Sequence, residues 1–74
     1  MALYEPLFAR PAVGVIVSCR CIMQDGHSVL KNAMPGDMGD VVGHRERGFN
    51  IRWQRTGRVD HFHDCETYML YRVV

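Results

Sequence analysis

Apolar and polar residues alternate along several short segments of the chain, which is the pattern of strands with one buried face. The clearest case is the segment 49–55. Its side chains Phe49, Ile51 and Trp53 are expected to point into the core, with polar residues between them. Similar patterns, bounded by turn residues, predict five strands in all, over residues 13–22, 39–45, 49–55, 58–64 and 68–73. We therefore expect an all-β domain.

Turn residues separate these strands. Pro35-Gly36 lies in a long loop at 23–38, and Thr56-Gly57 joins two strands as a hairpin turn. No helical period of useful length is present, although residues 65–67 could hold a single 3₁₀ turn. Five short strands with one long loop after the first predict a small, partly open barrel, which limits exposed sheet edges.

The chain divides into an extended N-terminal arm at 1–12 and a barrel at 13–74. Pro6 and Pro11 remove backbone donors from the arm and fix φ, so we expect it to be extended. Its apolar side chains are too many to leave in water, and we expect them to pack on the domain or on a second copy. These side chains are Leu3, Tyr4, Leu7 and Phe8. A homo-oligomer formed through the arm is therefore one expectation.

The loop order over 13–74 resembles the SH3-like small barrel. The stretch 36–42, with its glycine turn followed by valines, is similar to the turn and strand of KOW-type barrels. The strand 49–53, followed by Thr56-Gly57 and by 71–73, resembles the tryptophan-bearing strand, glycine turn and terminal tyrosine-arginine strand of Mind bomb-type repeats. The resemblance implies a five-stranded barrel fold.

The net charge of +1 conceals an uneven distribution. Residues 1–43 sum to −1, residues 44–58 to +4 and residues 59–74 to −2. The basic stretch holds Arg45, Arg47, Arg52, Arg55 and Arg58. With Trp53 interleaved as a surface aromatic, these arginines could meet phosphates and stacked bases. The alternatives are a solvated hairpin for the arginines and a core position for Trp53.

A second candidate site is His61-x-His63-x-Cys65. On one strand the three side chains point the same way, and imidazole and thiolate groups are zinc ligands. Cys19 and Cys21 could supply the remaining positions. The alternative is a pair of surface histidines with a buried Cys65 thiol. The odd number of cysteines, without a visible secretion signal, favours a reducing cytoplasm.

The sequence allows two interpretations of which side chains of residues 58–64 are buried. If Val59 faces the core, both histidines face it as well, which is costly unless they are paired or metallated. A bulge would instead put Phe62 inside and the histidines outside. A shift of one residue in register exchanges the two faces, so the alternation alone does not choose between them.

The expected function is a small non-catalytic binding module that recruits or regulates a protein partner. The chain shows no nucleophile elbow, phosphate-cradling loop or paired-carboxylate signature, so we expect no enzyme and no cofactor. Its longest apolar stretch, Ala12 to Val17, is too short to span a membrane. A nucleic-acid-binding barrel that uses the 44–58 hairpin is the alternative, and a zinc-stabilised domain is the third reading.

Overall fold

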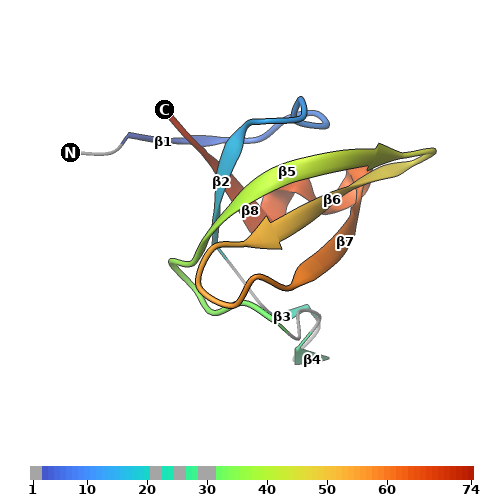
Figure 1. Cartoon of the computed structure of the whole chain (residues 1–74). Coiled ribbons are helices and arrows are strands. Elements are labelled where there is room, and N and C mark those ends of the chain that lie inside the picture. Colours follow the sequence, from blue (N-terminus) through green and yellow to red (C-terminus); the bar gives the residue numbers. More distant parts are fainter. Residues whose placement is uncertain (1–2, 21–22, 25–26, 29–31) are drawn as a thin grey trace.

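The computed structural model describes residues 3–20, 23–24, 27–28 and 32–74, and most of its regular structure is strand (Figure 1). The strands are β1 (Tyr4–Pro6), β2 (Ile16–Cys19), β3 (Met23–Gln24), β4 (His27–Ser28), β5 (Met38–Arg45), β6 (Gly48–Trp53), β7 (Val59–His63) and β8 (Leu70–Val73). A 3₁₀ helix, η1 (Asp64–Met69), precedes β8. Six strands form one antiparallel sheet in the order β1-β8-β2-β5-β6-β7, and β3 pairs with β4 alone. The all-β prediction is confirmed.

The N-terminal arm contributes a strand of its own, so the sheet has six strands among the described residues rather than five. β1 lies antiparallel to β8 (Figure 1). The Val74 N–H donates to the Leu3 carbonyl, and bonded pairs alternate along such a ladder. Pro6 therefore stands where its missing N–H would have faced outward, and its presence costs β8 no hydrogen bond.

The first predicted strand, 13–22, is shorter in the structure. Gly14 has a φ of 95° and its N–H donates to the Val41 carbonyl, so the chain turns there and β2 begins only at Ile16. Val13 lies outside the strand and is 58% exposed. β2 is also an inner strand with β8 and β5 on its two sides, and its polar residue Ser18 is buried.

The predicted core alternation on β6 is confirmed. Phe49, Ile51 and Trp53 are fully buried. The Phe62 ring of β7 stacks on Phe49 with the centroids 5.7 Å apart, and its edge meets Trp53. The rest of the buried apolar cluster comes from β2, β5, η1 and their connections, as Val17, Cys19, Ala33, Val41, Met69 and Leu70. The core therefore lies between the inner face of β5–β7 and the strands β2 and β8.

The β5–β6 hairpin contains a β-bulge between Val41 and Gly43. The extra residue, Val42, is half-exposed. Beyond the bulge the register places Arg45 opposite Gly48, at the end of the hairpin. The bulge increases the local twist and sets which side chains of β5 face outward at the hairpin tip.

β7 turns Phe62 into the core and both histidines outward, with no bulge in its pairing to β6. Val59 is exposed and Asp60 is half-buried, so the inward positions are Asp60 and Phe62. The 3₁₀ turn expected at 65–67 is present and extends over six residues. Asp25-Gly26 and residues 29–31 lie outside the described residues. In the part of the chain that is described, no helix has the length and apolar character to cross a membrane.

Deleting residues 1–9 should lower the stability of the domain by about 1–2 kcal/mol and its Tm by about 5–10 °C. The deletion removes β1 from the edge of β8 and also Leu7, which packs against the core. Thermal unfolding followed by circular dichroism measures the change. Phe8→Ser is the matched control, because Phe8 is 90% exposed and its loss should leave Tm unchanged. An unchanged Tm for the deletion would make the arm a free tail.

Candidate functional site

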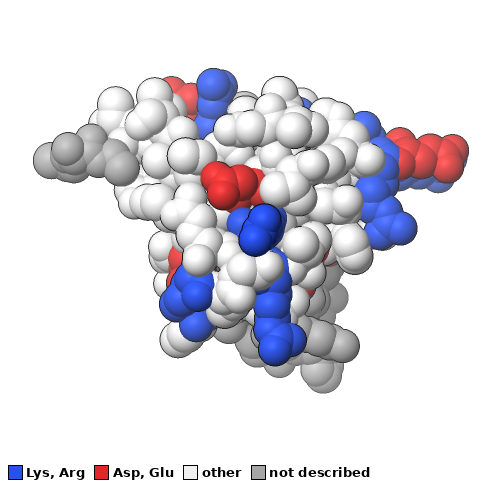
Figure 2. Space-filling model, in the orientation of Figure 1, with Lys and Arg blue, Asp and Glu red and all other residues white. Residues whose placement is uncertain are grey.

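The five arginines of the basic stretch are all exposed, and four of them are divided between the two ends of β6. Arg45 and Arg47 lie at the β5–β6 turn, whereas Arg55 and Arg58 lie in the connection from β6 to β7. β6 separates the two groups by about 17 Å at the usual rise of an antiparallel strand. Arg52 lies between them, on the outward-facing side of β6. Figure 2 shows the separate blue groups at the hairpin tip and at the lower end of the molecule.

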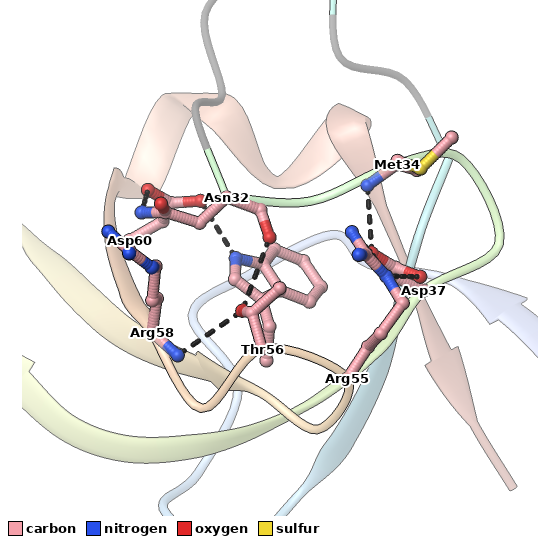
Figure 3. A network of polar contacts seen from close by, with 8 residues as sticks. Asn32, Met34, Asp37, Arg55, Thr56, Arg58 and Asp60 are labelled. Atoms are coloured by element: carbon pink, nitrogen blue, oxygen red, sulfur yellow. Dashed lines mark hydrogen bonds and ion pairs between the residues drawn. The ribbon is translucent and has the colours of Figure 1, made fainter.

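Arg55 is held by an ion pair at the lower end (Figure 3). Its Nη2 and Nε lie 2.9–3.1 Å from the Asp37 carboxylate, and the Met34 N–H donates to the same group at 2.9 Å. The hydrogen bonds from Arg55, followed by the one from Met34, hold the pKa of Asp37 below its usual value. Arg55 therefore ties the β6–β7 connection to the loop before β5, and its charge is already matched.

Acid should weaken this tie. Because the folded-state pKa of Asp37 is lowered, its stabilising contribution is complete above the unfolded value of about 3.9 and disappears as the pH falls through the folded value. We expect Asp37→Asn to reduce Tm slightly from pH 8 to about pH 5, and the difference from the wild type to vanish in stronger acid. Arg55→Gln should show the same pH dependence. A difference that grows on acidification would contradict the assignment.

Trp53 is buried, so its alternative role as a surface recognition aromatic beside the arginines is excluded. Its indole Nε1–H donates to Asp60 Oδ2 at 2.7 Å, and Asn32 Nδ2 donates to Asp60 Oδ1 at 2.9 Å (Figure 3). Asp60 therefore satisfies the one polar group of the buried indole and also fixes the end of the long loop. Trp53 is a structural residue of this network.

At the opposite end of β6, Arg45, Arg47, His61 and His63 line one pocket of about 320 Å³. A second hollow of about 260 Å³ adjoins it and shares Arg47 and His63. The sequence singled out these residues for two separate reasons, the basic stretch and the histidine pair. The structure brings the two sets together, because β7 pairs with β6 and carries the histidines to the arginines of the hairpin tip.

Among the described residues, the side chains proposed as zinc ligands do not gather into one metal site, although His63 and Cys65 line the same hollow. Cys65 lies in η1 and is exposed, so its predicted burial is wrong. The inward positions of η1 are Thr67 and Met69, since the 3₁₀ turn replaces the strand periodicity. Cys19 is buried in β2, and Cys21 lies outside the described residues. Within residues 3–20, 23–24, 27–28 and 32–74, no three potential ligands are grouped to hold a metal ion.

Sequence reasoning missed the contacts that tie the end of the arm to the hairpin tip. Arg10 Nε and Nη2 each lie 2.9 Å from an oxygen of Asp64, and Nη2 also donates to the Glu46 carbonyl at 3.1 Å. The hydrogen bonds from Arg10 are the largest cause of the lowered pKa of Asp64. His44 Nε2 lies 2.7 Å from the Pro11 carbonyl. These partners are distant in sequence, and no local spacing signals them.

The arm also presents apolar side chains to solvent. Of the four expected to be buried, only Leu7 packs against the core. Phe8 is 90% exposed. We use the name arm surface for the exposed apolar residues of the arm together with Val13, which follows it, and Val74, which pairs with Leu3; its members are Leu3, Tyr4, Phe8, Val13 and Val74. The arm encloses a groove of about 510 Å³, lined by residues 5–12 with Val15 and Arg72. The arm thus leaves apolar area available for contact.

Tyr4 of the arm surface contacts an aromatic residue of β8, Tyr71. The rings of Tyr4 and Tyr71 meet edge to face with centroids 6.1 Å apart, and the Arg20 guanidinium lies 5.2 Å from the centre of the Tyr71 ring. Strand pairing of β1 with β8 brings these residues together. Comparison with known proteins adds no further residue, since no family model, curated protein or solved structure matches the chain.

Proposed function

We propose that the protein is a small non-catalytic binding module that recruits or regulates a protein partner. The observation that carries this proposal is the arm surface. Large exposed apolar patches on soluble proteins mark sites of interaction. Here Leu3, Tyr4 and Phe8 of the arm are exposed, and the exposed Val74 donates its N–H to the Leu3 carbonyl.

The free edge of β1 supports the same proposal. β1 is an end strand of the sheet and pairs only with β8 among the described residues. The ladder directs the Glu5 backbone toward β8, so the Tyr4 N–H and the carbonyls of Tyr4 and Pro6 point away from the sheet. An extended segment of a partner could add to this edge while its side chains contact the arm surface.

The placement of the basic residues favours a protein over a nucleic acid. Four of the five arginines lie at the two ends of β6 with only Arg52 between them, and Arg55 is paired with Asp37, so the positive charge does not form one continuous track. Trp53 is buried and offers no stacking face to a base. A nucleic-acid-binding barrel remains the alternative, carried only by the exposure of Arg45, Arg47, Arg52 and Arg58.

We also propose that the fold is an SH3-like small barrel. The order β8-β2-β5-β6-β7, with a 3₁₀ helix just before the last strand, supports it. The proposed binding module needs neither a cofactor nor a structural zinc ion. A cytoplasmic location is proposed from the odd number of cysteines, of which Cys65 is exposed.

The purified chain should bind nucleic acid no more tightly than about 10⁻⁵ M at physiological salt, the ordinary nonspecific level. With Arg55 held by Asp37, the other arginines of the basic stretch are spread along β6 on a chain with a net charge of +1, which gives too few adjacent phosphate contacts for more. Fluorescence anisotropy with labelled single-stranded and duplex RNA and DNA measures this affinity at about 0.15 M salt. Submicromolar, sequence-preferring binding would replace the proposal with its alternative.

A further inference from the structure

At the tip of the β5–β6 hairpin, three cross-strand neighbours, Arg45, Gly48 and His63, line a pocket on the outer face of the sheet. Arg45 stands opposite Gly48 in the register, and Gly48 stands opposite His63 on β7. Residues directly opposite in antiparallel strands place their side chains on the same face. Gly48 has no side chain to fill the space between Arg45 and His63. A Cβ added there would collide with the Phe62 carbonyl, so glycine is also the residue that this close approach permits.

His61 occupies the neighbouring row of the same face. It stands opposite Asn50, whose Oδ1 lies 2.6 Å from His61 Nδ1. Because an amide oxygen only accepts, Nδ1 is the donor in this contact. Nε2 is the nitrogen left for a ligand, and it donates to an anion only when it also carries a proton. Together with His63 and the two arginines, His61 completes a pocket with four nitrogen-bearing side chains.

The two arginines of the pocket lack acidic partners. Within the described part of the chain, the guanidinium groups of Arg45 and Arg47 make no ion pair, whereas Arg10 and Arg55 each hold a carboxylate. The acidic residue of the pocket is Glu46, which lies in the turn between the two arginines and leaves an excess of positive charge. An anion entering the pocket would therefore meet unused, charge-assisted donors.

We propose that this pocket binds a phosphate monoester, presented as a phosphorylated side chain of the protein partner. The inference rests on the proposed function, since it names the chemistry of that partner. A phosphoryl group brings nearly two negative charges and three acceptor oxygens, which matches two guanidinium groups with imidazoles beside them. A carboxylate brings one charge and is satisfied by a single bidentate arginine, so it would leave half of the pocket unused.

Two observations favour a phosphorylated protein over a nucleic acid. The pocket adjoins the arm, because Arg10 joins Asp64 to the Glu46 carbonyl at the hairpin tip and Phe8 lies two residues earlier. A partner on the arm surface could thus extend into the pocket. The charged groups of the pocket also form a single cluster, about 17 Å from the arginines at the other end of β6. The aromatic residue that lines the pocket, Phe62, is buried and offers no ring face to a base. A nucleic acid presents a series of phosphates and bases, and the pocket does not offer it a matching series of basic and aromatic side chains.

A peptide titration of the full chain, followed by amide and side-chain NMR, tests the inference. The probes are Gly-Ala-phosphoserine-Ala-Gly and the same peptide with serine or with aspartate. We expect the phosphorylated peptide to bind at least about tenfold more tightly than the other two and to shift the signals of Arg45, Arg47, Gly48 and His63. Arg47→Gln should weaken its binding about tenfold.

Arg58→Gln is the matched control, because it removes the same charge from an exposed arginine at the other end of β6. It should change the affinity less than about twofold. Equal losses in the two variants, shifts confined to other residues, or equal binding of the three peptides would overturn the inference. Tighter binding of an oligothymidylate through Arg45 and Arg47 would replace it with a nucleic-acid site. The proposed function would still stand if a protein partner binds through the arm surface, which is measured separately with arm variants.

Discussion

Ile51→Ala should destabilise the domain by about 2–5 kcal/mol. Ile51 is fully buried at the middle of β6, and its Cγ2 lies where a Cβ on Gly39 would fall, so the side chain fills the space between β5 and β6. Removing three carbons leaves a cavity that the strands cannot close, because Gly39 has no side chain to fill it. In so small a domain this loss is comparable to the whole stability.

Urea unfolding followed by Trp53 fluorescence measures the effect of Ile51→Ala. Val59→Ala is the control, since Val59 is a β-branched strand residue that is 42% exposed, and its truncation should cost less than about 0.5 kcal/mol. A change for Ile51→Ala as small as that of the control would place Ile51 outside the core and contradict the register of β6.

Asp60→Ala should destabilise the domain by about 1–3 kcal/mol. The substitution leaves the buried Trp53 Nε1–H without an acceptor and releases Asn32 as well. Asp60→Asn is the matched variant, because it keeps one oxygen but offers an NH₂ group to the other donor, and it should fall between the wild type and Asp60→Ala. Chemical unfolding followed by circular dichroism gives the three free energies.

A double-mutant cycle with Trp53→Phe separates the hydrogen bond from the packing of the ring. In the Trp53→Phe background no indole N–H is present at this position, so Asp60→Ala should cost less than it does in the wild type. Equal costs in the two backgrounds would show that Asp60 does not stabilise the indole.

Much of the sheet could be predicted from the sequence because its strongest signals are local. The alternation of Phe49, Ile51 and Trp53 places the core face of β6 correctly. The arm was a different case. Whether Tyr4–Pro6 pairs as a strand depends on β8, at the other end of the chain, and a short segment with a proline carries no pattern of its own. The length of β2 depended on the left-handed conformation of Gly14, which a period of two does not reveal.

The candidate site was predicted in parts but not as a whole. The arginines and the histidines were each noted, yet only the β6–β7 register places His63 beside the hairpin tip. The role of Trp53 depended on Asp60, an acidic residue that faces inward because the indole N–H lies there. Cys65 was expected to be buried, but it lies in η1, where the buried residues are Thr67 and Met69.

The most direct measurement of the proposed function compares the proteins that co-purify with the wild type, with an arm variant and with a control. Leu3→Asp combined with Phe8→Asp disrupts the arm surface, and Val59→Asp adds the same charged group at the exposed face of β7. Extracts of the producing cells are treated with nuclease before capture. Each captured protein is then identified, purified and bound again to the isolated chain. We predict a partner that survives nuclease, binds the wild type and Val59→Asp equally, and is lost from the arm variant; retention of the same proteins by all three chains, or capture that nuclease abolishes, would contradict the account.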